Sequence, residues 1–197
     1  MSDPLDAAAL DRLFLTARTA NSYIDRPVSE QQLHAIWDLM KMGPTSANSL
    51  PARLVWCTTQ DAKDRLAACA GGTNPDKIRA APVSVIIAMD LEFHDHLPDL
   101  FPHADARSWF VGKDDLIEAT AFRNSSMQGA YLIIAARALG LDTGPMSGID
   151  LAAVDAAFFA DAPKVRTNFI ATLGYGDPAG IFARSPRPEF ARFNHIV

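Results

Sequence analysis

A short apolar run constrains the fold of this chain more than any other feature of its sequence. Residues 83–89 read Val-Ser-Val-Ile-Ile-Ala-Met, a β-branched stretch without a charged residue. Such a run is typical of a central strand that is buried on both faces of a sheet. A strand of that kind needs a layer of helices on each side, so we expect a three-layer arrangement.

Helical and extended patterns alternate along the rest of the chain, which is consistent with this arrangement. The clearest helix start is at Ser29, where Gln32 stands at the capping-box position, and Gly43-Pro44 ends that helix. The full set of predicted elements comprises helices over 3–14, 29–42, 61–70, 114–139 and 150–159, and strands over 53–58, 83–89 and 166–174.

Composition excludes several classes of protein. Hydrophobic residues make up 49% and charged residues 21% of the 197 residues, which predicts one folded domain over residues 1–197 rather than a disordered chain. The net charge of −5 without a basic block argues against a nucleic-acid surface, and no apolar run is long enough to cross a membrane. The acidic N-terminus is unlike a secretory signal, and two cysteines suit a reducing, cytoplasmic setting.

The sequence lacks the common motifs of dinucleotide binding and of nucleophilic catalysis. Residues 174–180 contain three glycines, but their spacing and Pro178 do not suit a dinucleotide-binding turn. Ser147 lies beside glycine without the spacing of a nucleophile elbow. A metal site built on His94, His96 and His103 stays open as an alternative to a polar loop.

Groups suited to a phosphorylated polar ligand occur at the ends of several predicted elements. Guanidinium groups suit a dianionic phosphate, whereas hydroxyl and amide groups suit a polyol and the edge of an aromatic ring. A backbone amide could meet the ring nitrogen that takes hydride, so the set as a whole suits flavin mononucleotide (FMN). It comprises Arg18, Thr19, Asn21, Ser46, Asn48, Asn74, Lys77, residues 144–148, Arg184 and Arg187.

Three sequence blocks occur in a fixed order and together form a specific motif set. They are residues 38–48 (Asp-Leu-Met-Lys-Met-Gly-Pro-Thr-Ser-Ala-Asn), residues 123–131, and residues 135–148, which end in Gly-Pro-Met-Ser-Gly. With these blocks the chain resembles the nitroreductase family of flavin oxidoreductases over nearly its whole length. Within that family it looks like the subgroup of malonic semialdehyde reductases and their NADH dehydrogenase relatives.

The resemblance implies an α+β fold, a three-layer α/β/α arrangement with a central mixed sheet. It also implies an intertwined homodimer in which the C-terminal segment of one subunit adds to the sheet of the other. FMN would lie at the dimer interface, with NADH or NADPH as electron donor in a ping-pong reaction on a small molecule. No protein nucleophile is needed, because the flavin carries the hydride.

The resemblance also assigns roles by position. Arg18 matches the phosphate arginine, and Arg184 and Arg187 match tail residues that return to the phosphate. Thr19 and Ala20 replace a basic residue and a serine of many relatives, which leaves Asn21 or a backbone amide for that contact. The other matches are Ser46 and Asn48 after the second helix, Asn74 and Lys77 at the pyrimidine edge of the ring, and Pro145, Met146, Ser147 and Gly148 near the reactive nitrogen. Lys77 and Ser147 would tune the reactivity of the flavin.

The acceptor stays open at this point. Leu50 and Ser147 stand where typical nitroaromatic reductases have Gln and Glu, which weakens nitro-compound reduction as the expected physiological role. A substrate carboxylate would need an anchor, for which Arg53, Arg107 and Arg123 are candidates. A broad nitro or quinone reductase, or a flavin-binding protein without turnover, are the alternatives.

Two segments lack a clear period. Residues 91–112 are expected to form a lid over the substrate, with Trp109 and Phe110 as apolar contacts. Residues 175–197 are rich in proline and phenylalanine, so we expect them to lie extended on a surface of their own or a neighbouring subunit.

Overall fold

A computed structural model describes residues 3–197 of the chain, and its centre is a four-stranded sheet. The strands are β1 (Ala52–Cys57), β2 (Val83–Asp90), β3 (Asp142–Met146) and β4 (Val165–Gly174), in the order β1-β2-β4-β3. The longer helices are α2 (Glu30–Met40), α3 (Gln60–Ala67), α4 (Asn74–Ala80), α6 (Asp114–Ala138) and α7 (Leu151–Phe158). Short helical turns are α1 (Ala7–Leu10), η1 (Asp11–Leu15), η2 (Ser46–Asn48), η3 (Phe93–His96), α5 (Leu97–Leu100), η4 (Ala106–Trp109), η5 (Pro178–Gly180) and α8 (Phe190–Phe193).

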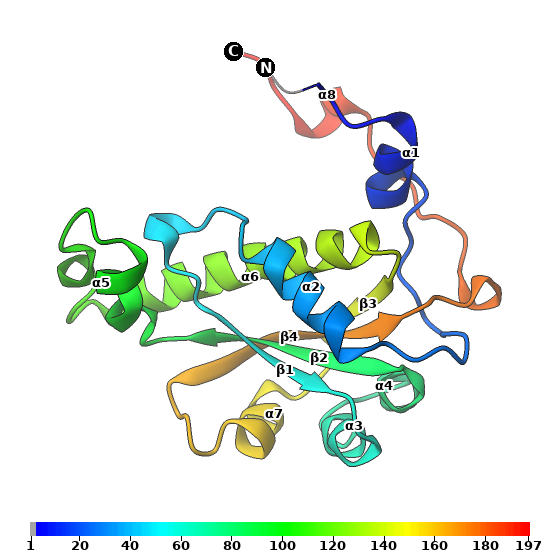
Figure 1. Cartoon of the computed structure of the whole chain (residues 1–197), viewed down its shortest axis with the longest axis horizontal. Coiled ribbons are helices and arrows are strands. Elements are labelled where there is room, and N and C mark those ends of the chain that lie inside the picture. The colour runs from blue at the N-terminus through cyan, green and yellow to red at the C-terminus, as the bar shows by residue number, and fades with distance from the viewer. Residues whose placement is uncertain (1–2) are drawn as a thin grey trace.

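Strand β2 is the buried central strand that the sequence predicts, since all eight of its residues are buried. Successive side chains of a strand point to opposite faces. Val85 and Ile87 therefore pack on one side, against helices α2 and α6, whereas Ile86 and Ala88 pack on the other side with residues of α3, α4 and α7. Figure 1 shows the resulting three layers, with α2 and α6 on one face of the sheet and α3, α4 and α7 on the other.

The expected three-layer α+β fold is confirmed, but the four strands of one chain do not form a mixed sheet. All three strand pairs are antiparallel. Helix α3 leads away from the end of β1 and α4 leads back, so the chain enters β2 at the end where it left β1, with Cys57 opposite Ser84. The one parallel contact of the sheet in the described residues is an isolated bridge between Thr19 and Thr143 of β3.

Strand β3 is the one strand of the sheet that the sequence did not predict, because its Gly144-Pro145 dipeptide is typical of a turn. The strand is an edge strand, where a proline without an N–H group is tolerated. Gly144 is required there by close packing: a Cβ would lie 2.5 Å from the carbonyl oxygen of Ala20 and from Oγ1 of Thr172.

The segment 91–112 folds into a small helical unit with its own core rather than an irregular loop. Phe93, Leu97, Phe110 and Ile117 are buried in one cluster at the end of the sheet. The tail, residues 175–197, is extended apart from η5 and the single turn α8. Phe182, Phe190 and Phe193 in the tail are each more than 60% exposed. Figure 1 shows α1 and the end of the tail outside the three layers.

Candidate functional site

The segment before α2 and the start of the tail lie side by side, although they are far apart in the sequence. The guanidinium of Arg18 donates to the carbonyl oxygen of Phe182. Arg184 donates back to the carbonyl oxygens of Leu15 at 2.7 Å and Ala17 at 3.1 Å. These reciprocal contacts place the predicted phosphate arginine beside one of the two predicted tail arginines.

Between these two segments lies a cavity of about 270 Å³ with a strongly basic lining. Four arginines line it and no acidic residue does. Gathering like charges is unfavourable unless an anion is bound, so such a cavity suits a phosphate group. The lining residues are Ala17, Arg18, Thr19, Asn21, Arg137, Phe182, Ala183, Arg184, Ser185 and Arg187.

Arg137 is the lining residue that the sequence analysis missed. It lies near the end of the long helix α6 and donates to the carbonyl oxygen of Leu13 at 3.0 Å. Burial lowers the pKa of its guanidinium; the charge of Asp142 opposes this shift, and that of Arg184 adds to it. It is the only charged residue among residues 130–139, which by itself is no sign of a ligand, and only the fold brings it to the tail.

The two tail arginines differ in what they contact. Arg184 reaches across to the segment before α2, whereas Arg187 donates only to its own neighbours, the carbonyl oxygens of Ser185 at 3.0 Å and Pro186 at 3.2 Å. Arg184 is therefore better placed than Arg187 to hold a phosphate in this cavity.

Helix α4 brings the predicted pair Asn74 and Lys77 to the same region. The ammonium of half-buried Lys77 donates to Oδ1 of Asn21 at 2.9 Å, and Asn21 donates in turn to the carbonyl oxygen of Gly180 at 3.3 Å. The buried Lys63 fixes the end of this helix by donating to the carbonyl oxygens of Arg79 and Ala81. Both residues belong to α4, as their spacing by one helical turn requires, but they contact different partners, Gly148 and Asn21.

The segment 145–148 lies partly in strand β3 and partly in the loop that follows it. Pro145 and Met146 belong to β3, and the side chain of Met146 packs against the core. Ser147 and Gly148 follow the strand and are exposed. Asn74 donates to the carbonyl oxygen of Gly148 at 3.0 Å, and a Cβ on Gly148 would lie only 2.9 Å from Nδ2 of Asn74.

Backbone contacts join these pieces into one region. Thr19 forms a parallel bridge with Thr143 of β3, and Ala20 donates to the carbonyl oxygen of Thr143 at 3.0 Å. A further cavity of about 690 Å³ is lined by Asn74, Ser147 and Gly148 together with residues 68–71, which follow α3, and residues at the start of α7. One end of the folded molecule therefore combines the basic cavity, the Asn21–Lys77 pair and the exposed turn at Ser147 and Gly148.

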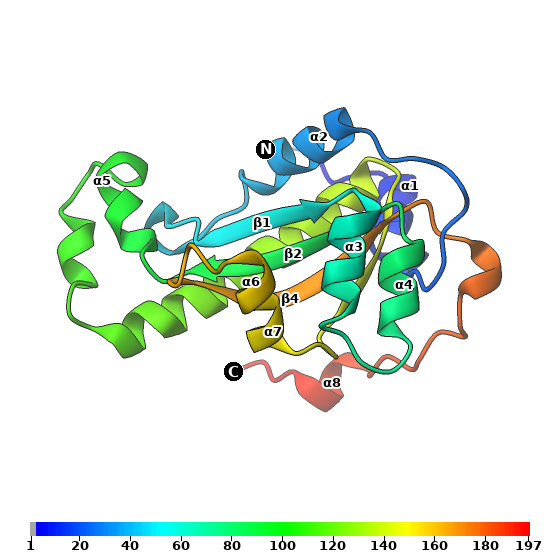
Figure 2. The ribbon, with the colours of Figure 1, turned by 90° about the horizontal axis from the view of Figure 1, so that it is seen from below.

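Ser46 and Asn48 are not part of this region. Oδ1 of the buried Asn124 accepts the backbone N–H of Ser46 at 2.8 Å, and the side chain of Asn48 donates to the carbonyl oxygen of Leu100 in α5 at 2.8 Å. Figures 1 and 2 both show η2 close to α5, at the opposite end of the molecule from α4. One chain thus holds two separate groups of the predicted residues.

The proposed lid contacts are also divided. Trp109 is 45% exposed and available to a ligand. Phe110 is only 6% exposed and packs edge-on against Phe93 with ring centroids 5.0 Å apart, so its assignment as a substrate contact is wrong. Because residues 91–112 lack a hydrophobic period, the sequence did not indicate which of Trp109 and Phe110 is buried.

The candidate histidines do not converge. The ring of His94 lies near Phe93 and Phe110, whereas the ring of His103 lies against Phe101. Within residues 3–197 no group of three or more His, Cys, Asp or Glu side chains is arranged to hold a metal ion.

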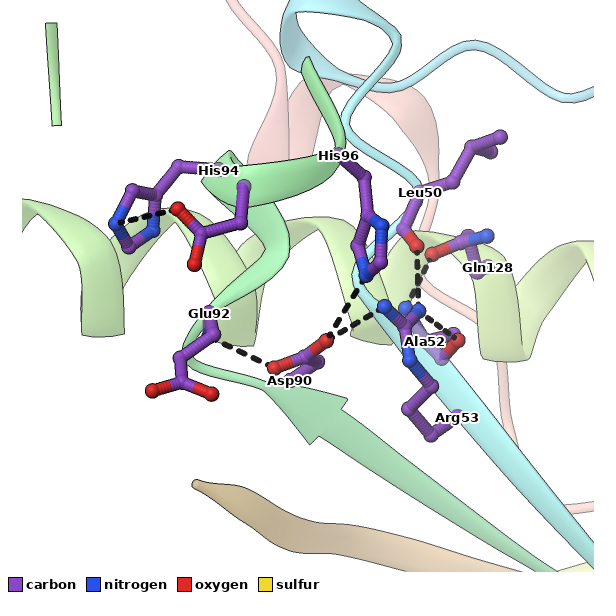
Figure 3. Close-up of polar contacts among 9 residues, drawn as sticks. Leu50, Ala52, Arg53, Asp90, Glu92, His94, His96 and Gln128 are labelled. Carbon is purple, nitrogen blue, oxygen red and sulfur yellow. Dashed lines mark hydrogen bonds and ion pairs between the residues drawn. The ribbon is translucent and has the colours of Figure 1, made fainter. Parts of the chain in front are cut away.

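Two of the three candidate carboxylate anchors already hold carboxylates of the protein. Arg53 lies 2.5 Å from Oδ2 of Asp90, as Figure 3 shows, and Arg107 lies 2.8 Å from Oδ1 of Asp95. The contact with Arg107 lowers the pKa of Asp95. Arg123, exposed on α6, makes no hydrogen bond or ion pair within the described part of the chain.

Comparison with known proteins decides the family. The sequence profile described as "Nitroreductase family" matches residues 15–175. The chain belongs to the nitroreductase family. This match spans both groups of predicted site residues except those of the tail.

Its relatives include chains of similar length and high identity. A protein of Burkholderia lata is 62% identical over 186 residues, which cover 94% of this chain and 95% of that protein. A protein of Xanthomonas oryzae pv. oryzae is 58% identical over 196 residues, which cover 98% of this chain and 100% of that protein. Both carry the name "Putative NADH dehydrogenase/NAD(P)H nitroreductase".

Solved structures confirm the nitroreductase fold. A nitroreductase-family protein of Exiguobacterium sibiricum, solved in complex with FMN, matches with a TM-score of 0.85 at 17% identity and covers 100% of this chain and 99% of that one. The enone reductase CLA-ER of gut-bacterial fatty acid saturation matches with a TM-score of 0.84 at 15% identity, covering 98% and 100%. In this nitroreductase-family chain, no helix within residues 3–197 has the length and apolarity needed to cross a membrane.

Proposed function

We propose that this chain is an FMN-dependent NAD(P)H oxidoreductase that reduces a small molecule in a ping-pong reaction. The observation that carries the proposal is the basic cavity formed by Arg18, Arg137 and Arg184, which continues into the Asn21–Lys77 pair. The chemistry of these donors fits the cofactor: guanidinium groups for a dianionic phosphate, and amide and ammonium groups for a polar ring edge. Gly148 leaves open the space beside Asn74 that a Cβ would fill.

FMN, when bound, would accept hydride from NADH or NADPH and pass it to the acceptor. The protein supplies position and charge. Lys77 would supply a positive charge to the reduced, anionic flavin, and Asn21 accepts a hydrogen bond that directs the ammonium group. Ser147 and Gly148 are exposed, and Asn74, one helical turn before Lys77, donates to the carbonyl oxygen of Gly148.

The second group of predicted residues would complete the site from another protomer. Ser46 and Asn48 lie at the end of the molecule opposite α4 (Figures 1 and 2), so they would contact FMN bound by the partner of a homodimer. The outer edge of β1 pairs with no other segment of residues 3–197, whereas β3 is bridged by Thr19. An apolar groove of about 760 Å³, lined in part by Trp37 and Trp56, borders that open edge.

We propose that the partner's tail adds to the edge of β1. The tail carries exposed Phe182, Phe190 and Phe193, which need an apolar surface. A tail strand that runs parallel to β1 would also make the sheet mixed, as the resemblance implies.

Malonic semialdehyde, reduced to 3-hydroxypropionate, is the acceptor that we propose. Hydride would go to the aldehyde carbon and a proton to its oxygen. Arg123 is the carboxylate anchor that remains, because Arg53 and Arg107 are ion-paired within the chain. Arg123 adjoins Asn124, which holds the backbone of Ser46, so it lies near the proposed partner side of the flavin.

Reduction of nitro compounds or quinones is the second candidate, and the names of the relatives favour it. The two candidates differ in their need for an anionic anchor. Arg123→Met should raise KM for malonic semialdehyde and leave KM for an uncharged quinone unchanged; an equal effect on both acceptors would remove Arg123 as the anchor.

The absorbance spectrum of the purified protein and one anaerobic titration with NADH test the proposal as a whole. We expect a yellow protein that releases FMN on denaturation and is bleached by NADH. A flavin-binding protein without turnover would stay yellow. A colourless protein that takes up no added FMN would refute the proposed function.

A further inference from the structure

The segment 45–51, which carries Ser46 and Asn48, has an unusually strained backbone. Ala47, Asn48 and Leu50 have φ angles of 50°, 50° and 40°, in the left-handed region that side chains with a Cβ disfavour. They are the only residues other than glycine with positive φ in the described part of the chain. Such a backbone persists only where the surroundings fix it, and it is concentrated at ligand sites.

Side chains on both sides of Leu50 hold this conformation. Its N–H donates to Oγ1 of Thr45 at 3.2 Å, and its carbonyl oxygen accepts from Nη1 of Arg53 at 3.1 Å. The same Nη1 donates to the carbonyl oxygen of Ala52 at 3.0 Å. One guanidinium group therefore bridges the end of the strained segment and the start of strand β1.

Arg53 is itself held by a buried carboxylate. Nη2 of Arg53 lies 2.5 Å from Oδ2 of Asp90, the last residue of β2. The other carboxylate oxygen, Oδ1, accepts the N–H of Glu92 at 2.7 Å, and Nε2 of His96 lies 3.8 Å from Oδ2. Figure 3 shows this arrangement, with Asp90 between Arg53 and the first turn of the segment 91–112.

The orientation of Arg53 leaves it little capacity for a substrate. One terminal nitrogen donates to two carbonyl oxygens and the other to Asp90. A guanidinium fork engaged in this way fixes geometry between rigid elements. Helix α6 supports the start of β1, because Gln128 accepts the N–H of Ala52 at 2.8 Å.

We propose that Arg53 is a positioning residue for the cofactor. It would fix the carbonyl group of Leu50 and thereby present Ser46 and Asn48 to the FMN of the partner protomer, and Asp90 would orient Arg53 for this task. The inference rests on the proposed function, but it assigns Arg53 a role other than that of a carboxylate anchor. It also ties the cofactor-binding segment to the segment 91–112 through one carboxylate.

Arg53→Met tests the inference through the dissociation constant of FMN, measured on the full-length protein by fluorescence titration. Loss of hydrogen bonds to a charged donor should weaken FMN binding by about tenfold or more. Arg53→Lys keeps a charge for Asp90 but loses the bridge to Leu50, so it should lie between wild type and Arg53→Met. If Arg53→Met does not fold, the FMN dissociation constant of Arg53→Lys tests the inference in its place.

The matched control is Arg65→Met. Arg65 also donates to a backbone carbonyl oxygen, that of Ala157, and its guanidinium lies 4.6 Å from the ring centre of Phe158, away from η2. This variant should lower the melting temperature but change the FMN dissociation constant by less than about twofold. A purely structural role for Arg53 would give the same pattern as the control.

A double-mutant cycle with Asn48→Ala separates positioning from general stability. If Arg53 acts through the segment, then Arg53→Met should weaken FMN binding much less when Asn48 is already alanine, while the two changes in melting temperature add. Additive losses in FMN binding would overturn the inference, as would unaltered binding in Arg53→Met or Arg53→Lys, and the proposed function would stand. Failure of the wild-type protein to bind FMN would refute both.

Discussion

The ammonium group of Lys77 lies 2.9 Å from the side-chain carbonyl oxygen of Asn21, and this contact joins helix α4 to the segment before α2. A neutral acceptor fixes the direction of the charge without neutralising it. Lys77 can therefore still interact with a ligand that becomes anionic.

Lys77→Ala should lower the reduction potential of bound FMN and slow its reduction by NADH. A charge pair at about 4 Å and an effective dielectric near 20 interacts by roughly 4 kcal/mol before solvation costs, so a net loss of about 1–3 kcal/mol is expected, or about 5- to 150-fold. Redox titration and stopped-flow reduction at matched flavin occupancy measure the two quantities. Asn21→Ala should give a smaller change of the same sign, and unchanged values for Lys77→Ala would place the residue among ordinary surface lysines.

Arg137→Met should weaken FMN binding by about tenfold, because a charge-assisted contact to the phosphate is lost. Riboflavin, which lacks the phosphate, should bind the variant and the wild type alike. Arg187→Met is the comparison, since Arg187 donates only to neighbouring carbonyl groups and should matter little. Equal losses for FMN and riboflavin would show that Arg137 supports the fold and not the phosphate.

Trp109→Ala and Phe110→Ala should have opposite effects on activity and stability. Removal of the buried Phe110 should cost about 3–5 kcal/mol of unfolding free energy. Removal of the exposed Trp109 should leave stability and flavin content intact and raise KM for the acceptor. Urea unfolding and steady-state kinetics on both variants provide the check, and a Trp109→Ala protein with unaltered KM would exclude the residue from the substrate site.

Shortening the tail should separate dimerisation from phosphate binding. A chain that ends at Arg184 keeps the tail arginine but loses Phe190 and Phe193, so it should sediment as a monomer and bind FMN weakly. A chain that ends at Gly176 also loses Arg184 and should bind no FMN. Analytical ultracentrifugation of both chains tests this; a yellow, dimeric chain ending at Arg184 would show that the last residues are dispensable for assembly.

The free energy of unfolding should fall as the pH rises from about 9 to 11. Burial raises the pKa of the Cys57 thiol from 9.0 to about 11, so in this range the unfolded chain loses a proton that the folded chain keeps. Burial also raises the pKa of Tyr23, which extends the trend to higher pH. Urea titrations across this range should show a shallower decline for Cys57→Ala than for wild type, whatever its absolute stability.

Sequence patterns predicted the fold well where local chemistry decides structure. The capping box at Ser29 and the apolar run at residues 83–89 specify α2 and β2 directly, and both are confirmed. The pattern at 144–145 misled, because turn-forming residues are also tolerated in an edge strand that packs too closely for a larger side chain.

The candidate site was predictable in its residue types but not in its grouping. Arg18 and Arg184 come together because the tail returns to the start of the chain, and Lys77 meets Asn21 because α4 packs beside the segment before α2; no local pattern reports either contact. Arg53 illustrates the same limit: an arginine at the start of a strand gives no sign of whether its partner will be a ligand or a carboxylate of the protein itself.

The contact between Arg18 and Phe182 joins residues that are 164 positions apart in the sequence. A polypeptide is made from its N-terminus, so Arg18 is synthesised early and Phe182 is added only when synthesis is nearly complete. The four guanidinium groups around the basic cavity cannot assemble before the tail has been made. Cofactor loading must therefore be one of the last events in the maturation of this protein, because a growing chain stalled at residue 170, within β4, would have Arg18 and Arg137 but neither of the tail arginines.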